Sequence, residues 1–298
     1  MKNIKLFIRN ILVVVASLVV CITSNMKVSA QALAAYDICN INPALVLNNE
    51  FRQDVDITLG LQSYYINEVN DSNKVIFFFH GGAFMSQPMD EHYLFADDIA
   101  TRTGAEVIIP IYPLIPWHNY ADVYNKLLYQ YAFYVINNPE KEIIFMGDSA
   151  GGTIAIGMMQ RIVALGMPKP SKLILISPWV DISMTSPYVT QYANTYMDSG
   201  ITVLQTAAIF WARGTKGVYD PLVNPMYGNI EGFPSTLVIS GTQDMFHGDI
   251  TLFESKLEKT GAEIQVIVGE GMVHEYPILY WPYCGSTVGE PIAKFVKA

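Results

Sequence analysis

The chain has 298 residues, of which 51% are apolar and 15% charged, a composition that excludes a disordered or solvating polymer. Its formal net charge is −9, from 18 basic and 27 acidic residues. The first 30 residues contain four of the basic residues and no acid, so the rest of the chain has 14 basic and 27 acidic residues, a net −13. A chain with that net negative charge repels polyanions, and we therefore expect no nucleic-acid partner.

The amino-terminal segment is typical of an export signal. Three basic residues precede an apolar run at 11–22, and residues 28–30, Val-Ser-Ala, provide the small residues that a cleavage site needs. We predict a signal peptide over 1–30 and a secreted or cell-envelope location. An uncleaved anchor is the less favoured alternative, because the run is shorter than the ~20 residues that span a bilayer. No later stretch is long and apolar enough to span, so we expect no stable membrane insertion after processing.

Two cysteines, Cys39 and Cys284, remain after removal of Cys21 with the signal. An exported protein can oxidise such a pair, although two separate buried thiols are the favoured interpretation. There is no CxxC and no Cys/His cluster, so a cysteine-ligated zinc is not expected. Phosphate-binding glycine motifs are also missing, and we expect neither a metal nor a cofactor.

From residue 55 onward, the sequence alternates between strand and helix patterns. The looser alternation over 55–66 predicts an antiparallel edge. Helical spacing predicts helices over 96–102, 120–136 and 150–165. Continuous apolar runs predict strands at 75–79, 106–111, 142–146, 172–176, 236–239 and 263–268. Such strands between helices indicate an α/β fold, a mostly parallel sheet covered by helices on both faces.

Two segments, 31–54 and 183–234, fall outside this alternation. In open parallel sheets, ligands bind beyond the carboxyl ends of the strands, and an insertion after a strand end can cover that edge. We therefore predict one catalytic domain over 31–298, with these two segments contributing a helical cap.

Residues 147–152, Gly-Asp-Ser-Ala-Gly-Gly, form a G-x-S-x-G motif between a predicted strand and a predicted helix. A nucleophilic serine in that context stands on a sharp, strained turn, with helix amide groups beside it. Ser149 is therefore the candidate nucleophile.

A second glycine motif, His80-Gly81-Gly82, also lies at a strand end. A tetrahedral oxyanion needs preorganised N–H donors, and glycines let the backbone approach. We expect Gly81, Gly82 and Ala150 to supply these donors. His80 is interpreted as a residue that fixes the loop.

A serine nucleophile needs a base, which in this type of fold follows the serine and the acid in the chain. Only His247 and His274 come after Ser149. His274 follows the last predicted strand, where a loop at the sheet edge can reach the serine. His247 is expected to begin a helix, in a surface or capping role.

The acid that orients the base has two candidates, because Asp244 and Asp181 each follow a predicted strand. Asp244 is favoured and Asp181 is the runner-up. Asp249 is expected inside a helix as a solvated or capping acid.

These motifs, taken in order, resemble the hormone-sensitive-lipase-like branch of the α/β-hydrolase family over about residues 74–298. The resemblance implies Ser149 as nucleophile, Asp244 as acid and His274 as base. It further implies oxyanion donors at Gly81, Gly82 and Ala150, an α/β-hydrolase fold and no cofactor. One departure is Ala83, where the family has a third glycine. The resemblance rests on His80-Gly-Gly-Ala, Tyr112-Pro-Leu-Ile-Pro, Gly147-Asp-Ser-Ala-Gly-Gly, Ser177-Pro-Trp-Val-Asp, Gly241-Thr-Gln-Asp and His274.

The sequence thus predicts an exported serine carboxylesterase that hydrolyses short-chain acyl esters through an acyl-enzyme. Its partner would be a small-molecule ester. Three alternatives stay open: a peptidase or amidase with the same triad, an esterase for acetylated polysaccharide, and a non-catalytic binding protein on this scaffold.

Overall fold

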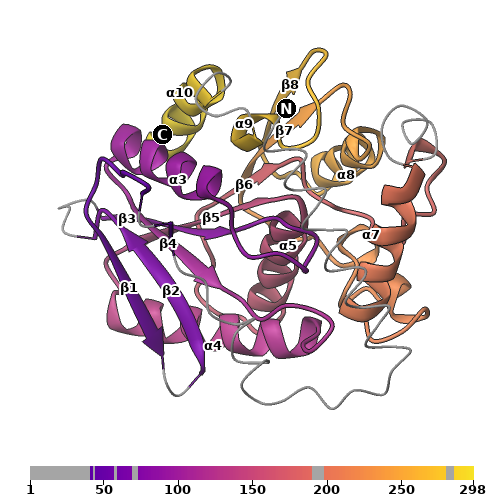
Figure 1. The fold of residues 1–298 in the computed structure, drawn as a ribbon, viewed down its shortest axis with the longest axis horizontal. Coiled ribbons are helices and arrows are strands. Elements are labelled where there is room, and N and C mark those ends of the chain that lie inside the picture. The colour runs from indigo at the N-terminus through magenta and orange to yellow at the C-terminus, as the bar shows by residue number, and fades with distance from the viewer. Residues whose placement is uncertain (1–40, 43, 57–58, 69–72, 190–197, 280–284) are drawn as a thin grey trace.

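The computed structural model describes residues 41–42, 44–56, 59–68, 73–189, 198–279 and 285–298 (Figure 1). The predicted signal peptide, Cys39 and Cys284, and residues 31–40, 43 and 190–197 of the predicted cap segments lie outside the described residues.

An eight-stranded sheet forms the centre, in the order β1-β2-β4-β3-β5-β6-β7-β8. Strand β2 pairs antiparallel with both β1 and β4, and all the other pairs are parallel. This confirms the predicted mostly parallel sheet and α/β-hydrolase fold. The strands are β1 (Phe51–Asp56), β2 (Leu61–Ile66), β3 (Lys74–Phe79), β4 (Glu106–Ile111), β5 (Glu142–Asp148), β6 (Lys172–Ile176), β7 (Ser235–Gly241) and β8 (Ile264–Gly269).

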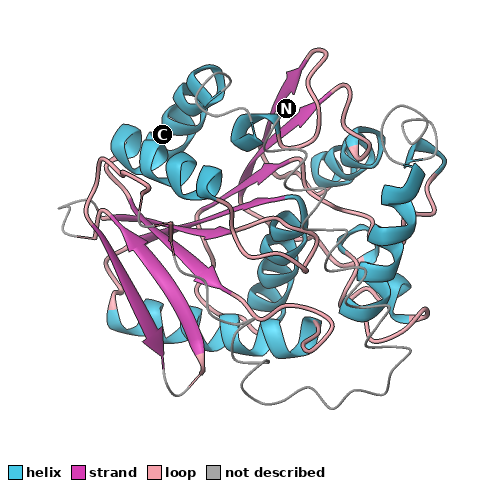
Figure 2. Cartoon of the chain, viewed as in Figure 1, coloured by secondary structure: helices cyan, strands magenta, loops and turns pink. Residues whose placement is uncertain are grey.

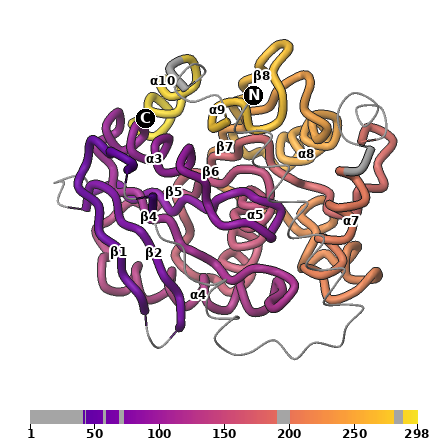
Figure 3. The backbone as a smooth tube through the Cα atoms, viewed as in Figure 1, coloured from indigo at the N-terminus to yellow at the C-terminus, as the bar shows by residue number. Residues whose placement is uncertain are grey.

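The antiparallel edge differs from the prediction, because it is a hairpin of two strands that begins at Phe51. Residues 51–54 were expected in a cap segment but pair with β2 instead. All six residues of β1 are exposed, so no alternation of apolar and polar side chains marks this strand in the sequence. Figure 3 shows this hairpin at one edge of the molecule and β8 toward the other.

Helices cover both faces of the sheet (Figure 2). They are α3 (Asp90–Thr103), α4 (Tyr120–Asn137), α5 (Ser149–Ala164), α7 (Asp198–Trp211), α8 (His247–Lys259), α9 (Tyr276–Leu279) and α10 (Gly285–Lys297). One face packs on α3, α9 and α10, and the other on α4, α5 and α8. Successive side chains of a strand point to opposite faces of the sheet. In β3, Phe77 and Phe79 pack on the face covered by α4, α5 and α8, whereas Ile76 and Phe78 pack on the face covered by α3, α9 and α10.

The described part of the predicted cap segment 183–234 contains α7 and two 3-10 turns, Gly217–Tyr219 and Pro225–Tyr227. Trp211 at the end of α7 is fully buried and stacks on Phe84, with ring centroids 4.1 Å apart. This contact ties α7 to the loop that follows β3. Within the described ranges, none of the helices has the length and apolar character needed to cross a membrane.

Candidate active site

Ser149 stands at the junction of β5 and α5, at the carboxyl edge of the sheet. Its φ of 48° places a non-glycine residue in the left-handed region, which is strained. The next residues continue directly as α5, so the helix amino terminus lies beside the serine hydroxyl. The turn therefore has the form that the G-x-S-x-G pattern predicts.

The flanking glycines are needed because backbone segments approach closely here. A Cβ at Gly151 would lie 1.9 Å from the carbonyl oxygen of Phe79, and one at Gly147 would lie 2.4 Å from the Gly151 carbonyl oxygen. No side chain fits at either position. The glycines therefore let α5 start against β3 and β5, which sets the position of Ser149.

Three side chains that follow three different strands meet at this edge. The Nε2 of His274 lies 3.0 Å from Ser149 Oγ, and its Nδ1 lies 3.0 Å from both carboxylate oxygens of Asp244. Asp244 is fully buried, whereas the side chain of His274 is 30% exposed. Serine catalysis requires a hydrogen-bonded chain of hydroxyl, imidazole and carboxylate, and these three side chains have that geometry.

The other candidates for the acid and the base, Asp181 and His247, form hydrogen bonds with other residues. Asp181 accepts from the Ser183 N–H and from Asn224 Nδ2, and His247 begins α8 as predicted, with Nδ1 3.0 Å from Ser240 Oγ. Asp249 lies in the first turn of α8 but is buried, contrary to the expected solvated acid. Burial raises the pKa of Asp249 to about 6.

The pKa of His274 reflects two opposing effects. Burial favours the neutral ring and lowers the pKa, but the opposing effects, of which the charge of Asp244 is the largest, outweigh burial and raise the pKa to about 9. The surroundings of His274 therefore favour the imidazolium form of its ring.

The loop after β3 is strained and turns sharply, with left-handed φ values of 53° at Ala83 and 61° at Phe84. The Gly81 N–H donates to Asp148 Oδ2 at 2.9 Å, so this amide already has an acceptor, which differs from the expectation that Gly81 is an oxyanion donor. In the described part of the chain, the Gly82 and Ala150 N–H groups have no such acceptor. His80 is buried and holds the loop, with Nδ1 2.8 Å from the Gly81 carbonyl oxygen and its ring stacked on Tyr112.

Three residues near this loop were not singled out as functional from the sequence: Asp148, His92 and Glu275. Asp148 Oδ2 also lies 3.2 Å from His92 Nε2. The Met89 N–H donates to His92 Nδ1, so Nε2 is the ring atom that donates to Asp148. Burial lowers the pKa of His92, but the opposing effects, of which the charge of Asp148 is the largest, outweigh burial and raise the pKa. The position of Asp148 inside the glycine motif was the available signal, whereas His92 lies on α3 with no motif around it.

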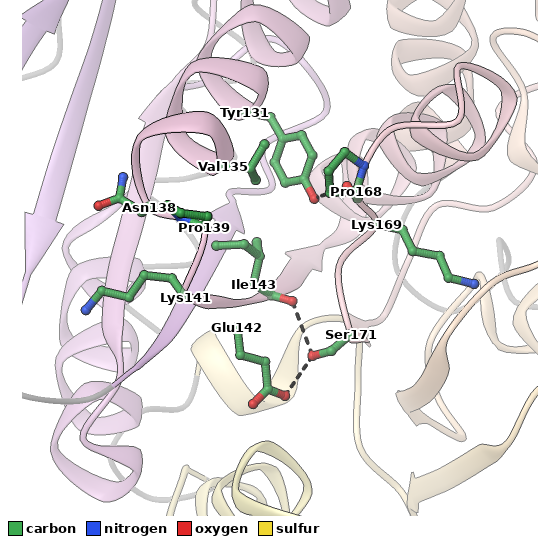
Figure 4. Close-up of a pocket in the computed structure, with 10 residues that line it drawn as sticks. All are labelled: Tyr131, Val135, Asn138, Pro139, Lys141, Glu142, Ile143, Pro168, Lys169 and Ser171. Carbon is green, nitrogen blue, oxygen red and sulfur yellow. Dashed lines mark hydrogen bonds between the residues drawn. The ribbon is translucent and has the colours of Figure 1, made fainter.

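A pocket of about 230 Å³ lies away from this site (Figure 4). It is lined by Glu142 and Ile143 at the start of β5, whereas Ser149 follows the end of that strand. Ser171 Oγ donates to Glu142 Oε1 at 2.8 Å in its wall. The pocket therefore opens at the opposite edge of the sheet. Over the described ranges, no group of three His, Cys, Asp or Glu side chains is placed to hold a metal ion.

Comparison with known proteins gives a consistent family. A model of the alpha/beta hydrolase fold matches residues 76–278. The chain is 29% identical to a triacylglycerol lipase of Mycobacterium tuberculosis over 83% of its own length, and spans about half of that relative, 54%. It is also 29% identical to an esterase of Acinetobacter venetianus, covering 80% of each.

Solved structures agree on the fold. A putative esterase from Staphylococcus aureus superposes with a TM-score of 0.78 at 25% identity, covering 92% of this chain and 95% of the other. An esterase of the bacterial hormone-sensitive lipase family has a TM-score of 0.76 at 19% identity, a likeness of fold alone, covering 96% of this chain and 97% of the other.

The fold and the Ser149–His274–Asp244 geometry define the class of serine hydrolases built on a parallel sheet. The chain belongs to the alpha/beta hydrolase fold family, and the two relatives compared above are a lipase and an esterase.

Proposed function

We propose that the protein is a serine carboxylesterase in which Ser149 is the nucleophile, His274 the general base and Asp244 the orienting acid. The observation that carries this proposal is the pair of 3.0 Å contacts that His274 makes, to Ser149 through Nε2 and to Asp244 through Nδ1. His274 takes the hydroxyl proton as Ser149 attacks the ester carbonyl, and returns it to the leaving alcohol. Water activated by the same imidazole then hydrolyses the acyl-enzyme.

The negative charge of the tetrahedral intermediate needs N–H donors at the place where the oxyanion forms. We assign this role to the Gly82 and Ala150 amides, with the Ala83 N–H as a third donor. Gly81, whose amide binds Asp148, holds the loop in place. Support for Ala150 comes from its position after the nucleophile in the first turn of α5.

For the substrate, we propose short-chain acyl esters. A row of stacked aromatic rings runs from the cap to the site: Trp211, Phe84, Trp179 and Phe246, the last packing edge-on against His274 at 5.0 Å. All four side chains are buried. Tightly packed rings beside the base leave a long acyl chain little room, and this supports a small acyl group.

The proposed location is outside the cytoplasm, in the secreted or cell-envelope fraction. The basic residues, apolar run and small residues of segment 1–30 support an export signal. Intact-mass measurement on exported material, with a first residue at Gln31, would agree with this proposal. Recovery of the uncleaved chain in a membrane fraction would favour the anchor.

A panel of acyl esters and matched amides tests the function. Purified wild-type protein should hydrolyse acetyl and butyryl esters, and Ser149→Ala should not. Faster turnover of palmitoyl esters would overturn the short-chain proposal, and faster turnover of amides would favour the peptidase or amidase alternative. Equal turnover by the wild type and Ser149→Ala would refute the catalytic assignment.

A further inference from the structure

Glu275 directly follows the base, but its side chain is buried, only 4% exposed, against the loop that follows β3. A Cβ added to Gly81 would lie 2.4 Å from Glu275 Oε1 and 2.2 Å from Asp148 Oδ2. Both carboxyl groups therefore lie against the α-carbon of the same glycine. They come from the ends of different elements, Asp148 from β5 and Glu275 from the loop after β8.

Few hydrogen-bond donors face these two carboxyl groups. Asp148 Oδ2 accepts from the Gly81 N–H and lies within hydrogen-bond distance of His92 Nε2, whereas Asp148 Oδ1 and Glu275 Oε1 are both buried with no donor in the described part of the chain. Two buried carboxylates side by side repel each other, and a single proton between them supplies the missing donor. A proton on one of the two carboxyl groups would join them in a hydrogen bond, which acts to raise the pKa of Glu275 and to lower that of Asp148.

The direction of the pKa values places that proton on Glu275. Burial and then the charge of Asp148 raise the pKa of Glu275 to about 8. Burial also acts to raise the pKa of Asp148, but the nearby His92 outweighs it, and the pKa falls below its ordinary value. The titratable groups that surround the pair are His92 on α3, His80 after β3, Tyr112 after β4 and His274 after β8.

We propose that Glu275, as a neutral acid that donates a hydrogen bond to Asp148, is a positioning residue that holds Gly81 and so aligns the oxyanion donors. The proposal rests on the proposed function, because it assigns Glu275 a role in that same site. Asp148 accepts three hydrogen bonds in this arrangement, from Gly81, His92 and Glu275. With all three made, the carboxylate is a fixed anchor for the loop.

The backbone of Glu275 is held independently of its side chain. Its φ is 53°, its N–H donates to Ser177 Oγ at 3.0 Å, and its carbonyl oxygen accepts from the N–H groups of Ile278 and Leu279. This strained conformation directs the side chain toward Gly81 instead of solvent. Substitution of the side chain therefore tests the carboxyl group while these backbone contacts persist.

Neutrality of Glu275 also matters for the base. Its Oε1 lies 3.8 Å from His274 Nε2, the atom that carries the proton between Ser149 and the leaving group. A charged carboxylate there would attract that proton away from the leaving group. Ionisation of Glu275 should therefore lower activity in two ways. The charged carboxylate would compete for the proton on His274, and it would repel Asp148.

The experiment compares Glu275→Leu, which removes the donor, with Glu275→Gln, whose amide still donates to Asp148 and never ionises. Leucine is chosen because it is not β-branched and so adds no further strain at a left-handed φ. Glu270→Leu and Glu270→Gln, in the exposed turn after β8, are the matched controls. For each variant, kcat and KM are measured with a butyryl ester from pH 5 to 10. The inhibition constant of a trifluoromethyl ketone, which forms a tetrahedral adduct, is measured alongside.

We expect Glu275→Leu to lower kcat by about 10²- to 10³-fold with KM nearly unchanged, the size of losing one oxyanion donor. The inhibition constant of the ketone should rise by a similar factor. Glu275→Gln should restore most of kcat. As pH increases, kcat of the wild type should pass through a maximum at mildly alkaline pH. In contrast, kcat of Glu275→Gln should rise once, at lower pH, and then show no alkaline fall. Both Glu270 variants should behave as the wild type.

Two results would overturn the proposal. One is a Glu275→Leu variant with the kcat and ketone affinity of the wild type while Ser149→Ala is inactive; the proposed function would then stand without this role for Glu275. The other is a Glu275→Gln variant whose kcat falls at alkaline pH as it does in the wild type. This second result would contradict the proposal even if Glu275→Leu fails to fold. Activity in Ser149→Ala would instead refute the proposed function.

Discussion

His274 Nε2 lies 3.0 Å from Ser149 Oγ, although the two residues are 125 positions apart in the chain. Their strands are not neighbours, since β6 and β7 lie between β5 and β8. The loop after β8 reaches across and is bound to the loop after β7: the Gln243 N–H donates to the Met272 carbonyl oxygen and the Gly271 N–H to Thr242 Oγ1, each at 2.8 Å. Base and acid are thus carried by two loops fixed to each other.

The two aspartates that follow strands should differ sharply on substitution. Asp244→Asn should lower kcat by roughly three to four orders of magnitude, because an amide no longer holds the imidazole in the required tautomer. Asp181→Asn, whose carboxylate binds Ser183 and Asn224, should change kcat far less. Steady-state kinetics on both folded variants checks this. Loss of turnover in Asp181→Asn alone would reassign the acid.

The pH profile should follow the ionisation of His274. Only the neutral ring accepts the Ser149 proton, so activity is low below the pKa of His274 and rises as pH increases through it. Because the charge of Asp244 is the main effect that raises that pKa, the rising limb of kcat/KM should lie above the ordinary histidine value of 6.5 and below the alkaline fall expected from Glu275. A midpoint at or below pH 6.5 would show that Asp244 does not stabilise the imidazolium.

Two glycine substitutions should separate steric overlap from backbone strain. Gly151→Ala places a Cβ 1.9 Å from the Phe79 carbonyl oxygen and should reduce the free energy of unfolding by more than about 3 kcal/mol. Gly166→Ala meets no atom within 4 Å but has a φ of 63°, so its cost should be about 1 kcal/mol. Denaturant unfolding of both variants measures the difference. Equal costs would contradict the close approach of α5 to β3.

Substitution of Trp211 should change both the stability of the fold and the preference for acyl-chain length. Trp211→Ala removes a buried ring stacked on Phe84 and should reduce the free energy of unfolding by about 3–5 kcal/mol. The space it leaves should raise the rate with decanoyl esters relative to butyryl esters. Tyr219→Ala, at a half-exposed cap position, is the control and should cost about 0.5 kcal/mol or less. An unchanged ratio of rates would separate the aromatic row from the acyl pocket.

The elements of the parallel sheet could be predicted from the sequence because their signals are local. The run at 75–79 is observed as Lys74–Phe79, and the helix expected over 120–136 is observed as Tyr120–Asn137. The Gly147–Gly151 spacing indicated the turn at Ser149 because the steric need for both glycines arises within one strand and one helix. Chain order then reduced the candidate bases to His247 and His274, and the place of His274 after the last predicted strand favoured it over His247 at a helix start.

The environment of Gly81 could not be predicted, since it depends on contacts between distant elements. Asp148, His92 and Glu275 come from β5, α3 and the loop after β8, and no spacing in the chain brings them together. The sequence therefore indicated that Gly81 belongs to the oxyanion loop, but not that its N–H binds Asp148. The burial of Asp249 is of the same kind, because the first turn of α8 alone does not determine what packs on it.

The most direct test of the account is to trap the nucleophile. A p-nitrophenyl phosphonate ester should react with one equivalent of wild-type protein, release one equivalent of p-nitrophenol, and leave its phosphonyl group on the peptide that contains Ser149, as mapped by mass spectrometry. Ser149→Ala should remain unlabelled, and His274→Ala should react far more slowly. Labelling of another residue, or equal labelling of Ser149→Ala, would contradict the assignment of Ser149 as the nucleophile.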